Sequence, residues 1–264
     1  MHLLVAAQSG WGKGYLTQSI IERNAPDYDQ VCVLDYADEY RGVVEANRAE
    51  WWIGGPRELQ WSEDEWNVFF TNNPRVVLSR HDRIPADKWR EICSNVASHI
   101  RKRSGSTLIV LDEAHFVVPQ RESYPSILQE LATTGRGEQI SYIVVTQRLS
   151  EIDKTVSTQM QSRLLGGFDG DDLDRVKPLI SGYDRRLHDP LGEVQSTTIP
   201  DDLLPEDRES PVTLQRHTDD NKQTVGSEWI YSNSSGDRRR IDTTGLEVAT
   251  HHYSPEGAKI ELPT

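Results

Sequence analysis

A short apolar run leads straight into a glycine-rich turn and a lysine in the stretch Leu3-Leu4-Val5-Ala6-Ala7-Gln8-Ser9-Gly10-Trp11-Gly12-Lys13-Gly14. The residues that follow, Tyr15 to Ile21, have the spacing of a helix. This is the layout of a phosphate-binding P-loop, in which backbone N–H groups and the helix dipole hold an anion and the lysine ammonium reaches the outer phosphates. The residues predicted to contact a bound nucleotide are Gln8, Ser9, Gly10, Trp11, Gly12, Lys13, Gly14 and Tyr15.

Two positions depart from the P-loop pattern G-x-x-x-x-G-K-[ST]. Ala7 replaces the first glycine, which is a mild change if its φ angle is negative. Gly14 replaces the serine or threonine whose hydroxyl binds Mg²⁺, so one metal ligand is missing. A water molecule can fill that position, because Mg²⁺ keeps several waters when it binds. The sequence leaves the strength of metal binding open.

A second apolar run ends in two carboxylates, in Ser106-Thr107-Leu108-Ile109-Val110-Leu111-Asp112-Glu113-Ala114-His115. A nucleotide hydrolase needs such a pair opposite its P-loop. Asp112 would hold Mg²⁺, directly or through water, and Glu113 would orient and deprotonate the attacking water. The alternative is a core strand that runs into a capped helix, but the P-loop upstream favours the catalytic interpretation.

A third informative stretch extends from Gly135 to Arg148. In it, a loop that carries Arg136 leads into an apolar strand pattern that ends in polar residues. Thr146 and Gln147 lie at its C-terminal end, level with the other two motifs, where a buried amide can sense a γ-phosphate. Strand and helix patterns alternate along the chain, with strands expected at 30–35, 51–53, 75–78 and 163–168 and helices at 65–70 and 86–103. The alternation predicts an α/β fold with a mostly parallel, doubly wound sheet and crossover helices.

The character of the sequence changes near Pro190. We expect a P-loop ATPase core at 1–190, an acidic linker with loops at 191–225 and a small β-rich appendage at 226–264. Short strand patterns in the last part are separated by Gly, Ser and Asn turns and fall at 228–231, 238–243, 246–250 and 258–260. Three consecutive arginines, Arg238 to Arg240, either contact phosphate or form a charged strand face, and the second interpretation is the commoner one.

The 264 residues carry a formal net charge of −13, with many more arginines than lysines. This charge argues against a protein that coats DNA through bulk attraction. An acidic surface with few lysines suits a high-salt cytoplasm, and we hypothesise a halophilic protein. No apolar run approaches the roughly 20 residues that span a bilayer, and no signal-peptide pattern precedes the first strand. We expect a cytoplasmic protein without a membrane span, with Cys32 and Cys93 as buried free thiols.

The motifs together resemble the HerA/FtsK family of P-loop ATPases over roughly residues 1 to 180. The matching segments are Asp35-Tyr36-Ala37-Asp38-Glu39-Tyr40, Leu111-Asp112-Glu113-Ala114-His115, and Thr134-Gly135-Arg136 through Thr146-Gln147-Arg148-Leu149-Ser150-Glu151-Ile152. The resemblance implies a RecA-like P-loop NTPase fold that uses ATP and Mg²⁺. Because the chain starts at the P-loop strand, it looks like the compact members of the superfamily, including viral and plasmid DNA-packaging ATPases, which lack the N-terminal barrel of the HerA helicases.

The resemblance also implies roles for several residues. Gln147 corresponds to the residue that senses the γ-phosphate, and Arg136 falls where related ring ATPases carry an arginine finger for the neighbouring subunit. Arg163 is a second candidate for the finger. Family members move DNA as ring-shaped hexamers, so we expect a homo-oligomeric ring in which Val118 to Tyr124 forms a pore loop that grips the phosphates of double-stranded DNA without reading its sequence.

The sequence thus predicts an Mg²⁺-dependent ATPase that moves or packages double-stranded DNA. One alternative is an ATP-binding assembly switch with weak turnover, because Gly14 lacks the metal-binding hydroxyl. Another is an ATPase that drives protein traffic, as in the related secretion and conjugation motors. The presence of Glu113, Arg136 and Gln147 favours turnover over the switch, since a pure binder needs no water-activating base.

Overall fold

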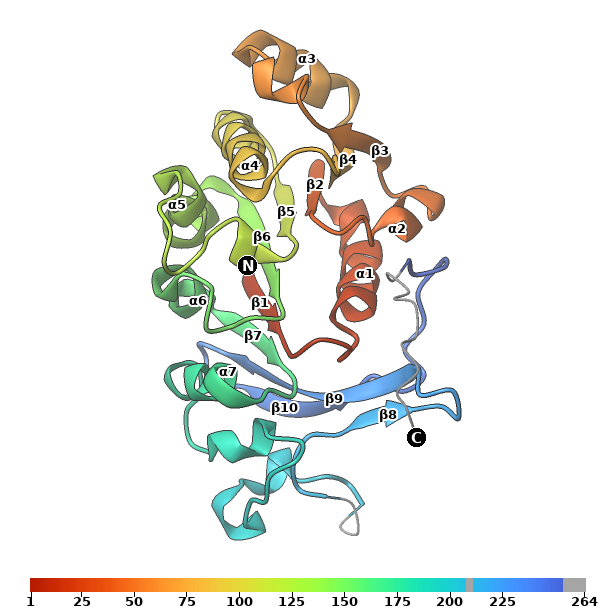
Figure 1. The fold of residues 1–264 in the computed structure, drawn as a ribbon, viewed down its shortest axis with the longest axis vertical. Coiled ribbons are helices and arrows are strands. Elements are labelled where there is room, and N and C mark those ends of the chain that lie inside the picture. The colour runs from red at the N-terminus through yellow and green to blue at the C-terminus, as the bar shows by residue number, and fades with distance from the viewer. Residues whose placement is uncertain (208–210, 254–264) are drawn as a thin grey trace, which may run out of the picture.

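The computed structural model describes residues 1–207 and 211–253 as an α/β arrangement built on one ten-stranded sheet (Figure 1). The strands are β1 (His2–Ala6), β2 (Gln30–Asp35), β3 (Glu50–Gly54), β4 (Arg75–Arg80), β5 (Thr107–Leu111), β6 (Ile140–Thr146), β7 (Ser162–Leu165), β8 (Arg216–Thr218), β9 (Thr224–Asn233) and β10 (Arg238–Asp242). The α-helices are α1 (Lys13–Asn24), α2 (Arg41–Glu45), α3 (Glu63–Asn72), α4 (Ala86–Ile100), α5 (Ser126–Thr134), α6 (Lys154–Gln159) and α7 (Gly170–Val176).

The strand order is β10-β9-β7-β1-β6-β5-β2-β4-β3, with β8 paired to β9 outside this path. The strands from β7 to β3 pair in parallel, and β8, β9 and β10 are antiparallel to their neighbours. Strand β6 lies between β1 and β5. The carboxyl ends of these three strands therefore meet at one edge of the sheet, and this edge gathers the three sequence motifs.

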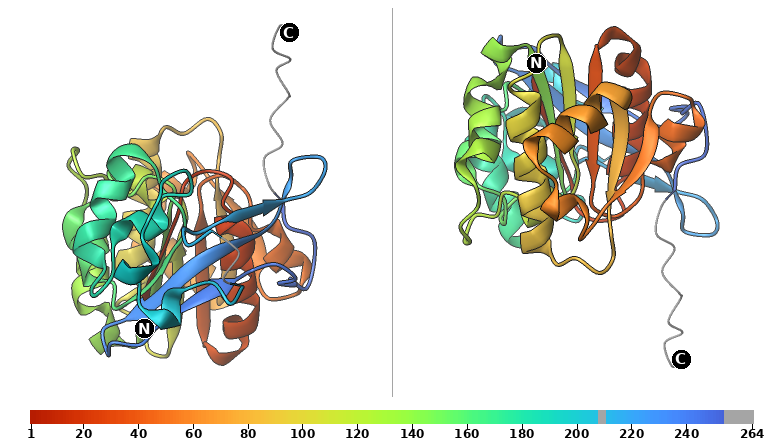
Figure 2. Two further views of the ribbon diagram at one scale, coloured as in Figure 1. Left: turned by 90° about the horizontal axis from the view of Figure 1, so that it is seen from below. Right: turned by 90° about the horizontal axis from the view of Figure 1, so that it is seen from above.

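Both faces of the sheet are covered, which explains why its strands read as continuous apolar runs rather than alternating ones. Leu4 and Leu34 pack with α4 and α5 through residues such as Trp89 and Leu128. Leu3 and the other alternate strand residues pack with α1 and α2 in a second core. Figures 1 and 2 show α4 to α7 on one side of the sheet and α1 and α2 on the other. The predicted mostly parallel α/β fold is confirmed.

Local capping explains where α3 begins. Ser62 Oγ accepts a hydrogen bond from the backbone N–H of Glu65, and the Glu65 carboxylate accepts one from the backbone N–H of Ser62 at 2.7 Å. This reciprocal capping box satisfies donors that the first helical turn leaves without partners. The predicted helix after Ser62 is therefore confirmed, and the predicted strand at 51–53 lies within β3.

The segment predicted as a β-rich appendage pairs with the core. Strand β9 is antiparallel to β7, with Leu164 opposite Tyr231, so the C-terminal strands extend the central sheet. Figure 2 shows β8 and β9 running across the end of the sheet that carries β7. The division of the chain at residues 190 and 225 stays a prediction.

The predicted strand at 246–250 is wrong. Its hydrogen bonds go to two helices instead of a neighbouring strand. Ala249 N–H donates to the Glu22 side chain of α1 at 2.6 Å, and Thr250 Oγ1 donates to the backbone carbonyl of Gly42 in α2 at 2.6 Å. The segment therefore lies along α1 and α2. The strand predicted at 258–260 lies outside the described residues.

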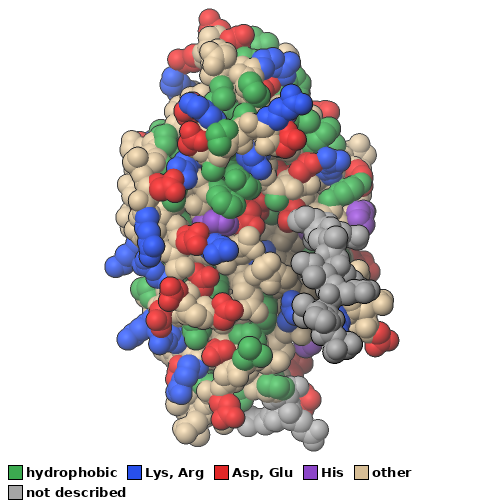
Figure 3. Space-filling model, in the orientation of Figure 1, with side chains coloured by type: hydrophobic (Ala, Val, Ile, Leu, Met, Phe, Trp, Pro, Cys, Tyr) green, Lys and Arg blue, Asp and Glu red, His purple; other side chains and the backbone are tan. Residues whose placement is uncertain are grey.

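The surface carries both signs of charge. Figure 3 shows Lys and Arg side chains interspersed with Asp and Glu over the face in view. Cys32 and Cys93 are buried and free, as the sequence predicts. Within residues 1–207 and 211–253, none of the helices combines the length and apolar character that a bilayer crossing requires.

Candidate functional site: a phosphate-binding loop facing a carboxylate edge

The P-loop connects β1 to α1 and uses two left-handed glycines. Gly10 has φ 72° and Gly12 has φ 84°, conformations that glycine adopts without the steric cost of a Cβ atom. Helix α1 begins at Lys13, whose ammonium donates to the Gln8 carbonyl at 3.0 Å across the loop. The turn is therefore closed around the lysine, with the N-terminus of α1 directed at the same space.

Trp11 fixes the loop to the sheet. Its side chain is buried, and the indole Nε1–H donates to the Glu228 carbonyl of β9 at 3.1 Å. The ring lies against Gly166 and Gly167, where an added Cβ would stand 2.4 Å from ring atoms. The two glycines are therefore required for the indole to pack here.

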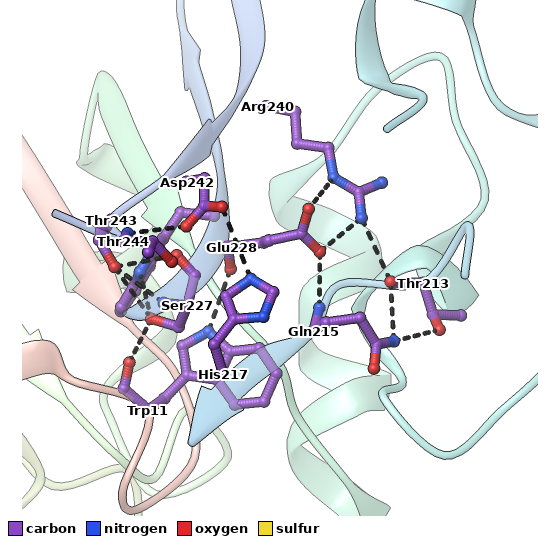
Figure 4. Close-up of polar contacts among 11 residues, drawn as sticks. Trp11, Thr213, Gln215, His217, Ser227, Glu228, Arg240, Asp242, Thr243 and Thr244 are labelled. Atoms are coloured by element: carbon purple, nitrogen blue, oxygen red, sulfur yellow. Dashed lines mark hydrogen bonds and ion pairs between the residues drawn. The ribbon is translucent and has the colours of Figure 1, made fainter. Parts of the chain in front are cut away.

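Strand β9 also binds the carbonyl groups of the loop (Figure 4). Ser227 Oγ donates to Trp11 O at 2.7 Å, and Thr224 Oγ1 donates to Gly10 O at 2.8 Å. Hydrogen bonds to these carbonyls hold the loop in one conformation before an anion arrives. Sequence reasoning missed Thr224 and Ser227, because nothing in the local pattern links a polar strand near the C-terminus to a loop near the N-terminus.

The acidic motif follows β5 at the same edge. Asp112 is buried, and its Oδ1 accepts a hydrogen bond from Tyr40 OH at 3.4 Å. Glu113 has φ 43°, a left-handed conformation that is rare for a side chain larger than glycine and is found preferentially at functional sites. His115 Nδ1 lies 3.3 Å from Glu113 Oε2, and burial lowers the pKa of this imidazole to about 4.

Burial and mutual repulsion shape the protonation of these groups. Burial raises the pKa of Asp112 well above its usual value, and the charges of Glu113, Asp35 and Glu39 add to the rise. Burial also raises the pKa of Glu113, although Lys13 opposes this change. A carboxylate with a raised pKa is a better proton acceptor, which suits a general base.

Gln147 directly follows β6, the strand that lies between β1 and β5. Its backbone is close enough to the Glu113 carboxylate to lower the pKa of that group. Lys13, at the start of α1, interacts electrostatically with Asp112 and Glu113. The structure therefore brings Lys13, Asp112, Glu113 and the backbone of Gln147 to the same edge of the sheet.

The two arginines proposed as fingers lie elsewhere. Arg136 is exposed at the amino end of β6, close enough to the Met1 ammonium to lower its pKa. It lies at the opposite edge of the sheet from Lys13. Arg163 is half-buried within β7, where it donates to Thr158 O at 3.2 Å. Neither arginine therefore lies beside Lys13, Asp112 and Glu113 in this chain.

The strand-end segment after β2 adds a residue that was not assigned to the site. Asp35 accepts backbone N–H groups of Glu39 at 3.1 Å and Tyr40 at 3.0 Å, which closes a tight turn. The turn brings Glu39 toward Lys13. Burial and the charges of Asp35 and Glu113 raise the pKa of Glu39 to about 7, against the lowering effect of Lys13.

The residues present fit a divalent cation bound together with a nucleotide. In the part of the chain that the structure describes, Asp112 Oδ2 is buried without a hydrogen-bond partner, as expected of an oxygen that awaits a cation or its water. The same residues contain no ready-made cage of three or more Asp, Glu, His or Cys ligands. Mg²⁺ in nucleotide sites needs none, because one or two carboxylates combine with phosphate oxygens and water.

Solved structures with the same fold include two viral ATPases and a VirB4 protein. The genome packaging NTPase B204 from Sulfolobus turreted icosahedral virus 2, in complex with ATP-gammaS, is 12% identical with a TM-score of 0.55, over 90% of this chain and 95% of that one. The DNA-packaging ATPase B204 from Sulfolobus turreted icosahedral virus is 11% identical with a TM-score of 0.54, over 90% and 95%. VirB4 of Thermoanaerobacter pseudethanolicus is 13% identical with a TM-score of 0.58, over 91% and 88%.

The TM-scores establish a shared fold, and at 11–13% identity they establish the fold alone. The RecA-like P-loop ATPase fold expected from the HerA/FtsK-type motifs is confirmed. No family model matches the sequence, and no curated protein matches it.

A buried ion pair holds the strand that binds the P-loop. Arg240 of β10 donates to Glu228 of β9 through Nε at 2.8 Å and Nη2 at 2.6 Å, and also to Val212 O at 2.8 Å. Glu228 in turn accepts the backbone N–H of Gln215 at 2.8 Å (Figure 4). The arginines of β10 are therefore structural here, as the charged-strand interpretation predicts, with Arg238 bound to Asp202.

We predict that Glu228→Ala lowers the free energy of unfolding by about 3–5 kcal/mol, because it leaves the Arg240 guanidinium buried and unpaired. Urea denaturation followed by tryptophan fluorescence measures the change. The control is Arg239→Ala, which removes an exposed guanidinium from the face of Tyr231 and should cost only about 0.5–1 kcal/mol. Equal effects of the two substitutions would contradict the prediction.

Proposed function

We propose that the protein is an Mg²⁺-dependent ATP hydrolase that works as a ring-shaped motor to translocate or package double-stranded DNA. The observation that carries this proposal is the convergence of Lys13, Asp112, Glu113 and Gln147 at the carboxyl ends of β1, β5 and β6. A binding protein without turnover needs the lysine and the loop, but it has no use for a strained, buried glutamate beside them.

The chain's own residues divide the work of hydrolysis. Lys13 and the loop N–H groups bind the phosphates, and Asp112 holds the cation. The bound Mg²⁺ neutralises charge on the phosphate oxygens. Glu113 takes the proton of the attacking water, and Gln147, next to Glu113, detects whether the γ-phosphate is present.

The position of Arg136 supports the proposed assembly into a ring. This exposed side chain is at the wrong edge of the sheet to act on its own site, so a catalytic role requires a neighbouring subunit. We propose a homo-oligomeric ring, a hexamer by resemblance, with Arg136 as the finger.

The DNA would pass a loop next to the acidic motif. Val118 is buried, whereas Arg121 is exposed, so the segment from Val118 to Tyr124 has a fixed base and an accessible tip. Such a tip suits contacts with backbone phosphates that carry no sequence information. The genome-packaging role of the structurally similar B204 ATPases supports DNA as the cargo. The acidic composition supports a cytoplasm of high salt as the working environment.

We predict that linear double-stranded DNA stimulates steady-state ATP hydrolysis, since a translocase couples turnover to its track. The measurement compares phosphate release with and without DNA at low and high salt. An equal rate of hydrolysis with and without DNA would favour an ATPase that translocates protein. ATP binding without hydrolysis would favour the assembly switch.

We predict that Glu113→Gln binds ATP with unchanged affinity but lowers kcat by about 100- to 10,000-fold, because the amide cannot accept the proton of the attacking water. Equilibrium binding of a fluorescent ATP analogue and phosphate release provide the two readouts. Glu91→Gln on the exposed surface of α4 is the matched control and should hydrolyse ATP normally. Retained turnover in Glu113→Gln would refute its role as the base.

We predict that Arg136→Ala lowers turnover by about 1,000-fold or more, the value of a supplied arginine finger. Mixing it with Glu113→Gln subunits should restore activity, because interfaces then form between an intact Glu113 site and an intact Arg136. Arg163→Ala mixed in the same way is the comparison. If the mixture with Arg163→Ala recovers ATP hydrolysis and the mixture with Arg136→Ala does not, Arg163 is the finger instead.

A further inference from the structure

The space beside Gly14 is already filled by other side chains. A Cβ atom built on Gly14 would lie 2.6 Å from Glu39 Oε2 and 2.8 Å from His252 Nε2, distances that real Cβ atoms do not show. A serine or threonine at this position would therefore have to displace both groups. The Oε2 atom of Glu39 therefore lies beside the place where the P-loop serine or threonine side chain would be.

The turn after β2 explains why Glu39 reaches this place. The Asp35 carboxylate binds the backbone N–H groups of Glu39 and Tyr40 and closes the chain on itself. Asp38, at the centre of the turn, has φ 62°. A left-handed residue reverses the chain direction within a short span. The side chain of Glu39 consequently extends across the carboxylate edge toward the start of α1.

His252 closes the same space from the C-terminal segment. Its Nδ1 lies 2.8 Å from Gln18 Oε1, while the Gln18 amide nitrogen donates to Glu22 Oε1 at 2.7 Å. Gln18 Oε1 is thus an acceptor, and Nδ1 of His252 carries the hydrogen. The unprotonated Nε2 therefore lies on the ring edge that faces Gly14. The ring also packs edge-on against Tyr15, with centroids 5.8 Å apart.

The acidic side chains around this space outnumber the one lysine that they share. Glu39, Asp112 and Glu113 all interact electrostatically with Lys13, the cation at the centre of the group. Three carboxylates exceed the charge of one ammonium, and Asp112 Oδ2 is buried without a partner in the described chain. Mg²⁺ and Mn²⁺ prefer carboxylate oxygens, so a divalent ion would balance the group.

We propose that Glu39 is a metal ligand that replaces the hydroxyl missing at Gly14, so that the divalent cation of the bound nucleotide is held by Glu39 together with Asp112. In this proposal, Gly14 removes the P-loop hydroxyl and at the same time makes room for the Glu39 carboxylate. Gly14 is then required because a larger residue would push the ligand away. The inference rests on the proposed nucleotide binding and specifies how its cation is held.

The test measures Mn²⁺ binding, followed by electron paramagnetic resonance, in the presence of saturating ATP-gammaS. Glu39→Ala should weaken Mn²⁺ binding about 10-fold or more. The double variant Glu39→Ala, Gly14→Ser should recover most of the affinity, because removal of the carboxylate makes room for a hydroxyl. Gly14→Ser alone should bind Mn²⁺ no better than the native chain. Glu50→Gln, at an exposed position, is the control.

Binding of the nucleotide in EDTA separates this inference from the proposed function. The native protein and Glu39→Ala should bind ATP-gammaS similarly without metal, since Lys13 and the loop are the same in both. Failure of the native protein to bind the nucleotide would refute the proposed function. Native Mn²⁺ affinity in Glu39→Ala, or a loss that Gly14→Ser does not recover while nucleotide binding is intact, would overturn the role of Glu39.

Discussion

The structure depends on how the backbone of the P-loop is held. A loop that presents N–H groups to an anion must direct its carbonyl groups elsewhere and satisfy them there. Here the carbonyls of Gly10 and Trp11 accept hydrogen bonds from Thr224 and Ser227 of β9. Strand β9 pairs with β7, which pairs with β1, so the loop and its support belong to one sheet. The P-loop is therefore supported only when the N-terminal strand and β9 have come together in one sheet.

The carboxylate edge is the second constraint on the site. Glu39, Asp112 and Glu113 face one ammonium, and burial raises the pKa of each carboxylate. Their repulsion reduces the stability of the folded chain. A cation bound as proposed would relieve the repulsion, so a ligand that brings Mg²⁺ would stabilise the folded state by mass action. Binding and folding stability are thus coupled through the same side chains.

Sequence patterns succeeded where a local rule decides the outcome. The capping box at Ser62 fixes the start of α3, and the apolar runs that end in Gln8, Asp112 and Gln147 are strands that lead to one edge. They failed at 246–250, where an alternating pattern looks like a strand. That segment hydrogen-bonds to α1 and α2, a choice that depends on which surface is free nearby.

By itself the sequence determined the α/β class and predicted Lys13, Asp112, Glu113 and Gln147 as site residues, because periodicity and motif spacing are local properties of the chain. Only the tertiary structure decided that β9 supports the P-loop and that the Glu39 carboxylate lies beside Gly14. Those contacts join residues distant in sequence, and their energies depend on packing and on electrostatic distance. Neither quantity is contained in the order of residues along one segment.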